Sequence, residues 1–195
     1  NMTPDQVLDE FRDAEALLEG HFILSSGLHS RTYLQCARVL MDTRRAARLA
    51  EALASKITDN AGGAIDCVVA PAMGGLIIGH EVARALNVDS MFLERVDGEF
   101  TLRRGFHLSE NANVVMIEDI VTTGLSSCEA IAAIGAHGGH VVSAGCLIDR
   151  SGGTADIGVT LASLASISVE TFSADNVPAD LADVPAIKPG SRGLK

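Results

Sequence analysis

Residues 114–127, with the sequence VVMIEDIVTTGLSS, combine features that few folds need in this order. The apolar residues at the start predict a strand that is covered on both faces. The acidic pair Glu118 and Asp119 follows, and a loop of small and polar residues around Gly124 then leads into a helix. Because open α/β sheets bind ligands at the carboxyl ends of their strands, we expect the acidic pair to lie in a binding site.

The loop from Thr122 to Ser127 has the groups needed to bind a phosphate. Its backbone N–H groups and hydroxyls can donate hydrogen bonds, and Gly124 tolerates conformations that a Cβ forbids. Ser126 and Glu129 form the pattern of a capping box, which predicts a helix start here and an anion site at its dipole. Two carboxylates would repel that phosphate, so we expect them to accept hydrogen bonds from vicinal ribose hydroxyls, with a divalent cation close by. The alternative is an acidic strand end before an ordinary turn.

The same segment resembles the diphosphosugar-binding motif of the type I phosphoribosyltransferases. In that family the acidic pair holds the ribose hydroxyls of 5-phosphoribosyl 1-diphosphate, and the Thr-Thr-Gly-x-Ser loop holds its 5-phosphate. Leu125 stands where the family often has a second small residue, a change that a backbone N–H contact would survive. The resemblance implies Mg²⁺ as cofactor, without direct protein ligands. It also implies that the sugar diphosphate contacts Glu118, Asp119, Ile120, Val121, Thr122, Thr123, Gly124, Leu125 and Ser126.

Composition narrows the class of protein. The 195 residues suffice for one domain with a substantial core. A formal net charge of −10 argues against a general nucleic-acid binder. The apolar runs are too short to span a membrane, and the first residues are acidic and amphipathic, so we expect a cytoplasmic protein without a membrane partner. The cysteines are far apart in the sequence, which predicts free buried thiols: Cys36, Cys67, Cys128 and Cys146.

Hydrophobic periodicity predicts alternating helices and strands over the middle two-thirds of the chain. An amphipathic helix is expected over 5–18, ended by Gly20, and a second over 43–57, capped by Asp42 or Thr43. The last residues, from 177 onward, are expected to form an irregular surface segment. Strands are predicted at 65–70, 88–93, 114–118, 141–147 and 161–169, and further helices at 76–86 and 126–136. This order predicts an α/β fold with a central, mostly parallel sheet flanked by helices.

Two further loops resemble family segments, the first one common to the family and the second one found in its orotate phosphoribosyltransferase branch. Residues 71–75 resemble the diphosphate-binding loop, with Met73, Gly74 and Gly75 as the expected contacts; a structural strand-to-helix turn is the alternative. Residues 94–106 form a charged hairpin or mobile loop that resembles the catalytic loop, which in this branch often reaches the neighbouring subunit of a homodimer. A charged hairpin tip in solvent is the alternative.

The cationic residues of the 94–106 loop only partly match those of the family. Arg95 matches the family arginine, whereas Val96 stands where the family has a lysine and no lysine occurs anywhere in the loop. Arg103 and Arg104 are the natural substitutes, and His107 is a weaker one. The resemblance therefore implies that Arg95, Arg103 and Arg104 neutralise the departing diphosphate.

The orotate site is expected from two regions. Residues 20–33 resemble a hood segment that covers orotate, in which Ser25 stands where a lysine is common. Arg150 has the spacing from Thr122 at which this branch places an arginine that pairs with the orotate carboxylate, while Thr122 touches the pyrimidine ring. A surface pair of Asp149 with Arg150 is the alternative. We expect one phosphoribosyltransferase domain over 1–195, with a core at about 43–170 and a small N-terminal hood at about 1–40 that includes the C-terminal segment.

The implied reaction transfers the phosphoribosyl group to orotate, with Asp119 as the acidic residue expected to matter most. It gives orotidine 5′-monophosphate and diphosphate. Two rivals remain open: transfer to another nucleobase, and a regulator that binds the sugar diphosphate without turnover. A dinucleotide oxidoreductase is remote, because Gly74, Gly75 and Gly79 lack the Gly-x-Gly-x-x-Gly spacing.

Overall fold

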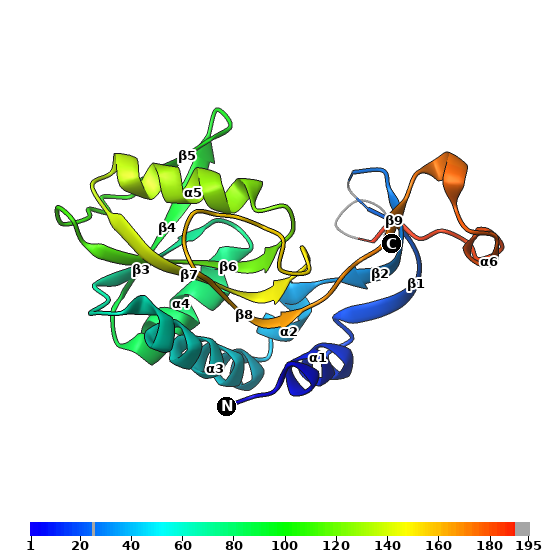
Figure 1. Cartoon of the computed structure of the whole chain (residues 1–195), viewed down its shortest axis with the longest axis horizontal. Coiled ribbons are helices and arrows are strands. Elements are labelled where there is room, and N and C mark those ends of the chain that lie inside the picture. Colours follow the sequence, from blue (N-terminus) through cyan, green and yellow to red (C-terminus); the bar gives the residue numbers. More distant parts are fainter. Residues whose placement is uncertain (25, 190–195) are drawn as a thin grey trace.

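The computed structural model describes residues 1–24 and 26–189, and it contains two sheets and six α-helices within that range (Figure 1). The large sheet contains β3 (Cys67–Pro71), β4 (Asp89–Val96), β5 (Glu99–Leu102), β6 (Asn113–Val121), β7 (His140–Asp149) and β8 (Leu161–Ser166). The small sheet contains β1 (Leu17–Ile23), β2 (His29–Leu34) and β9 (Thr171–Phe172). The helices are α1 (Pro4–Asp13), α2 (Cys36–Leu40), α3 (Thr43–Ala61), α4 (Gly75–Leu86), α5 (Leu125–Ala136) and α6 (Ala179–Ala182).

The predicted mostly parallel sheet is confirmed. Its strand order is β5-β4-β3-β6-β7-β8, and every neighbouring pair except the antiparallel β4–β5 hairpin is parallel. The register pairs Val69 with Met116 and Glu118 with Cys146. Because β3, β6 and β7 run in the same direction, the loops after them leave the sheet at one edge, where the site lies.

Helices cover both faces of the large sheet (Figure 1). On one face, α1, α3 and α4 bury a cluster that includes Leu53 of α3 and Ile78 of α4 against Ile117 of β6. On the other face, α5 packs Ala130 and Ile134 against a second cluster. Both faces of β6 are therefore covered, as its unbroken apolar sequence predicted.

The predicted first helix is correct at its start and wrong at its end. Thr3 and Gln6 form a capping box, but the helix stops at Asp13 instead of Leu18. Leu17 and Leu18 belong to β1, where they pair with Leu34 and Tyr33 of β2. Helical spacing of apolar residues continued past Asp13, but pairing with a distant strand decided the conformation.

The C-terminal segment is more ordered than predicted. It forms the short helix α6, and the Ile187 backbone then bonds to β1: Ile187 N–H donates to His21 O at 2.9 Å, and Ile23 N–H donates to Ile187 O at 2.8 Å.

His21 and His29 are joined across β1 and β2 by a ring N···N contact of 2.6 Å. Ser25 and residues 190–195, about which the sequence made predictions, lie outside the described residues.

Three of the four cysteines are buried free thiols as predicted, whereas Cys128 is an exposed free thiol.

Within the described parts of the chain, no helix combines the length and apolar character needed to cross a bilayer.

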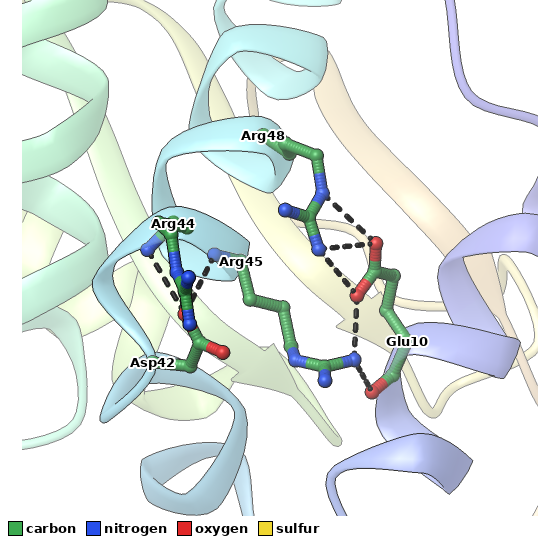
Figure 2. A network of polar contacts seen from close by, with 5 residues as sticks. All are labelled: Glu10, Asp42, Arg44, Arg45 and Arg48. Carbon is green, nitrogen blue, oxygen red and sulfur yellow. Dashed lines mark hydrogen bonds and ion pairs between the residues drawn. The ribbon is translucent and has the colours of Figure 1, made fainter.

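Glu10 joins α1 to α3 through two arginines (Figure 2). Arg45 Nη1 donates to Glu10 Oε2 at 2.6 Å and to the Glu10 backbone oxygen at 2.9 Å, and Arg48 donates to both carboxylate oxygens. The Glu10 and Arg45 side chains are 16% and 17% exposed. Asp42 caps the start of α3 by accepting from the N–H groups of Arg44 and Arg45. This network fixes the helix that precedes the small sheet against the main core.

We expect Glu10→Ala to lower the free energy of unfolding by about 1 to 3 kcal/mol, less than for a fully buried pair because some solvent contact remains. The measurement is urea unfolding of both proteins. Asp9→Ala, which breaks the exposed Asp9–Arg12 pair in the same helix, is the matched control and should change stability by less than about 0.5 kcal/mol. Equal effects of the two substitutions would contradict a stabilising role for the Glu10 network.

Candidate active site

A cavity of about 210 Å³ opens at the carboxyl edge of the large sheet, between the β3–α4 loop and the β6–α5 loop. Its walls are formed by Pro71, Ala72, Gly74, Gly75, Glu118, Asp119, Ile120, Thr122, Gly124, Ser126 and Ser127. The two segments that the sequence assigned to the diphosphate and to the sugar phosphate therefore line the same space. Other predicted contacts lie outside these walls: Val121 is buried in the core, and Thr123, Leu125 and Met73 are exposed.

The acidic pair lies within the last part of β6, which continues to Val121 rather than ending at Glu118 as predicted. Glu118 is 7% exposed, and Ser127 Oγ donates to its Oε2 at 2.5 Å. Burial raises the pKa of Glu118, the Ser127 hydroxyl opposes that rise, and the charge of Asp119 adds to it. Burial likewise raises the pKa of Asp119, opposed by the Ile120 N–H that donates to its Oδ1 at 2.8 Å.

Gly74 is the point at which the β3–α4 loop touches the acidic pair. A Cβ added there would lie 2.8 Å from both carboxylate oxygens of Asp119. A Cβ on Gly75 would lie 2.9 Å from the backbone oxygen of Ile117. These glycines therefore have a structural reason to lack side chains, since β6 and its carboxylate occupy the space. The peptide bond between Ala72 and Met73 is cis.

The start of α5 is open to an anion, although the predicted capping box is wrong. Gly124, with φ of 88°, is the N-cap, and no side chain caps the helix. A Cβ on Gly124 would also lie 3.0 Å from Ile157 Cγ2. Because the helix begins at Leu125, Ser126 remains at the cavity wall, and Glu129 bonds to Arg95 instead. The uncapped helix start presents N–H groups and a positive dipole end to the cavity.

The arginines of residues 94–106 are not at this cavity. These residues include the β4–β5 hairpin, in which Arg95 donates to Glu129 of α5 at 2.6 Å and to Gly98 O at 2.6 Å. Arg104 forms a two-bond pair with Glu94, each bond 2.8 Å, which lowers the pKa of that carboxyl. Arg103 is exposed. The predicted charged hairpin is confirmed, but within one chain its cations are held away from the predicted diphosphate site.

Arg150 lies beside the cavity at the end of β7. Its backbone N–H donates to Val121 O at 2.8 Å, which places it next to the Thr122 loop. Its side-chain Nε is buried and has no hydrogen-bond partner among the described residues, and burial lowers the pKa of the guanidinium. Asp149 and Arg150 do not form the ion pair that was the alternative. The Asp149 carboxylate instead accepts from the N–H groups of Ser151 and Gly153. The Arg150 guanidinium is therefore available to pair with another group.

The sequence reasoning missed what two residues of the site do, one of which, Ser127, it had placed in the phosphate loop. Ser127 is fully buried against Glu118, and no local pattern indicated that contact, because it depends on how α5 packs on β6. Asp149 shapes the turn after β7, and here a signal existed: an aspartate before Ser-Gly-Gly is typical of a turn built by a side-chain carboxylate.

Comparison with known proteins agrees with this geometry. Residues 39–179 match the family model described as "Phosphoribosyl transferase domain". The orotate phosphoribosyltransferase of Erythrobacter litoralis is 61% identical over 98% of this chain and 99% of its own, and that of Rhizorhabdus wittichii is 60% identical over 98% and 97%. The chain belongs to the orotate phosphoribosyltransferase family. The crystal structure of the Aeropyrum pernix orotate phosphoribosyltransferase has a TM-score of 0.64 at 26% identity, over 82% of this chain and 93% of that one.

Membership in this family confirms the resemblance drawn from residues 114–127 and the type I phosphoribosyltransferase fold. In this member of the orotate phosphoribosyltransferase family, the cavity lies where the β6–α5 loop and the β3–α4 loop meet. The structure brings together Gly74, Gly75 and most of the predicted sugar-diphosphate residues. The roles of individual residues remain predictions.

We expect Gly74→Ala to lower turnover by about tenfold or more, because a 1 Å displacement of Asp119 is enough for a large loss. Gly74 has φ of −59° and ψ of −34°, so alanine fits the backbone and only the contact with Asp119 is disturbed. Gly135→Ala is the matched control: no atom lies within 4 Å of the added Cβ, and the substitution in α5 should leave turnover unchanged. Steady-state kinetics of both variants decide, and an unaffected Gly74→Ala enzyme would contradict the coupling.

Asp119→Asn should lower turnover by well over tenfold while stabilising the protein at neutral pH. The folded-state pKa values of Glu118 and Asp119 are both raised, so the wild type loses stability as pH rises through them and the buried pair becomes charged. The amide removes one of those charges and keeps the Oδ1 acceptor for Ile120 N–H. Thermal unfolding should show a higher midpoint for the variant at pH 7 and a shrinking difference at acid pH. A lower midpoint at pH 7 would show that the charge stabilises the fold.

Proposed function

We propose that this protein transfers the phosphoribosyl group from 5-phosphoribosyl 1-diphosphate to orotate, giving orotidine 5′-monophosphate and diphosphate in pyrimidine biosynthesis. The observation that carries the choice of orotate is the buried, unpartnered Nε of Arg150 next to the sugar-phosphate loop. A guanidinium in this state favours a planar carboxylate, and orotate has one. Thr122 lines the cavity and follows Val121, whose backbone oxygen accepts from the Arg150 N–H, and it would touch the pyrimidine ring.

The cavity suits an activated pentose phosphate. The 5-phosphate would lie at the uncapped start of α5, held by the N–H groups and hydroxyls of residues 122–126. Glu118 and Asp119 would accept hydrogen bonds from the ribose hydroxyls, and residues 73–75 would approach the diphosphate through their backbone. The negative charge of Asp119 would also stabilise the positive charge that develops at the anomeric carbon. In this step the bond from the anomeric carbon to diphosphate oxygen breaks, a bond to the orotate ring nitrogen forms, and the ring N–H proton is released.

Mg²⁺ fits this site as a partner of the substrate. Among residues 1–24 and 26–189 no cluster of three or more His, Cys, Asp or Glu side chains could hold a metal ion by itself. Mg²⁺ keeps several waters and commonly binds with substrate phosphates, so it would enter this site with the diphosphate and without a direct protein ligand. When bound, Mg²⁺ would neutralise charge on the diphosphate.

The hairpin arginines suggest a second subunit. Arg95 and Arg104 pair with Glu129 and Glu94 of their own chain, so neither reaches the diphosphate side of the cavity as folded here. We propose a homodimer in which residues 94–106 reach the neighbouring site. There, Arg95, Arg103 and Arg104 would neutralise the leaving group after exchanging their present partners.

The small sheet supplies the other side of the proposed site. We infer that residues 1–40 and the C-terminal segment form the hood over orotate, and that residues 43–170 form the core of a single domain over 1–195. Support comes from β9 pairing with β2 and from Ile187 bonding to β1, which join the two ends of the chain. We also place the reaction in the cytoplasm, where the four free cysteines would stay reduced.

The proposal predicts orotate-dependent turnover. The protein is mixed with the sugar diphosphate, Mg²⁺ and orotate, uracil or adenine, and loss of the base is followed by absorbance. Turnover should be at least about 100-fold faster with orotate, because a site that pairs a carboxylate rejects bases that lack it. Faster turnover of another base would favour a different acceptor, and binding of the sugar diphosphate without turnover would favour a regulator.

Arg150→Ala should raise the Michaelis constant for orotate by about tenfold or more, the value of a lost charge-assisted hydrogen bond. The Michaelis constant for the sugar diphosphate should change much less. Arg12→Ala, which removes a half-exposed arginine of α1, is the control and should leave both constants unchanged. Equal effects of Arg150→Ala on both substrates would refute the carboxylate assignment.

A further inference from the structure

Ser127 is buried completely, in contrast to the neighbouring Ser126, which is exposed at the cavity. Its hydroxyl donates to Glu118 Oε2 at 2.5 Å, a bond that joins the first turn of α5 to β6. Ser127 is among the residues around the cavity, but it has no exposed surface, so a substrate bound there has little access to its side chain. The Ser127 hydroxyl therefore acts on Glu118 and, through it, on whatever Glu118 binds.

The bond leaves the two oxygens of Glu118 in different states. Oε2 is occupied by Ser127, whereas Oε1 has no hydrogen-bond partner among the described residues. Oε1 is not fully enclosed by the protein, and Glu118 lines the cavity. One oxygen is thus fixed in the protein and the other is available from the cavity side.

We propose that Ser127 is a positioning residue that holds Oε2 of Glu118 so that Oε1 accepts a hydrogen bond from a vicinal hydroxyl of the bound pentose. This role rests on the proposed function, because it takes the pentose of the sugar diphosphate as the ligand of Glu118. It goes beyond that function by giving Ser127 a task other than binding the phosphate, which the proposed function assigns to residues 122–126.

The surroundings of Glu118 explain why a donor is needed there. Burial and the neighbouring charge of Asp119 raise the pKa of Glu118, and the Ser127 hydroxyl lowers it. From β7, Cys146 faces Glu118 in the register, and burial raises the pKa of its thiol so that it is neutral. Cys36, at the start of α2, is a buried neutral thiol near Asp119. Two hydroxyls favour the charged form of Glu118: that of Ser127 has the larger effect, and that of Ser126 at the cavity wall has a smaller one.

The direction of the pH effect follows from these groups. Removing the Ser127 hydroxyl leaves only the smaller effect of Ser126 against the influences that raise the Glu118 pKa, so the carboxyl takes up a proton at a higher pH. A protonated Glu118 is a weaker acceptor for a pentose hydroxyl. The acid limb of the pH profile for kcat/KM of the sugar diphosphate should therefore move to higher pH, and a smaller loss from misorientation should remain at alkaline pH.

The test measures that profile at saturating orotate for wild type, Ser127→Ala and a matched control. Ser143→Ala is the control, because Ser143 is also a fully buried serine, but it lies on β7 and its hydroxyl donates to Thr160 O. Ser127→Ala should lower kcat/KM for the sugar diphosphate about tenfold or more near neutral pH and shift the acid limb upward. Ser143→Ala should leave the acid limb in place. Ser127→Cys offers only a weak donor in a similar volume and should shift the limb in the same direction, which keeps the test available if Ser127→Ala does not fold.

A double variant separates positioning from general packing. In a Glu118→Gln background, which has no carboxyl at this place, Ser127→Ala should no longer move the acid limb. An acid limb that stays at its wild-type place in both Ser127 variants, or an equal shift with and without the Glu118 carboxyl, would overturn the proposal.

Binding of ribose 5-phosphate provides a readout that does not depend on orotate. Calorimetry from acid to alkaline pH should show weaker binding to Ser127→Ala on the acid side, and Ser143→Ala should match wild type. If the wild type binds ribose 5-phosphate but turns over another base, the proposed acceptor fails while the Ser127 comparison still stands. If Ser127→Ala and wild type bind it equally at every pH, the positioning role fails while orotate turnover can still be observed.

Discussion

The candidate active site depends on keeping two adjacent carboxylates inside the protein at the end of β6. Water would favour their charges more than the protein does, which is why burial raises the pKa of both Glu118 and Asp119. The surrounding structure compensates locally: Ser127 donates to one carboxylate, and the Ile120 N–H donates to the other. Gly74 completes the arrangement by leaving space for Asp119. Burying the two charged carboxylates lowers the stability of the fold, but it holds their oxygens in place before the proposed sugar ligand binds.

The parallel sheet makes this arrangement possible. Because β3 lies next to β6 in parallel register, the loop after β3 meets the carboxylates that β6 presents. α5 then begins directly after the same strand and offers its uncapped N–H groups a short distance from the acidic pair. Groups that attract an anion and groups that accept hydroxyl hydrogens thus lie at opposite ends of one loop, which matches a molecule carrying both a phosphate and a diol.

Several features could be read from the sequence because they depend on neighbouring residues. The order of strand, acidic pair, glycine loop and helix at 114–127 predicted the site and its family, and the glycines at 74 and 75 predicted the second wall. The helix from Thr43 and its Asp42 cap could also be predicted, because an N-cap residue bonds to N–H groups only two and three positions away. The first helix was predicted too long, because pairing of Leu17 and Leu18 with β2 overrode the local pattern.

The sequence by itself determined the glycine loop predicted to bind phosphate, the acidic pair and the mostly parallel sheet, since covalent order and hydrophobic period set which groups follow which strand. Only the tertiary structure decided how those groups are held. It made Glu129, the expected helix cap, the partner of Arg95 and placed Ser127 on Glu118. It also left the Arg150 Nε without a hydrogen-bond partner among the described residues, while Asp149 shaped the turn beside it. These outcomes join residues from different elements, and such contacts depend on how helices and strands pack rather than on any spacing along the chain.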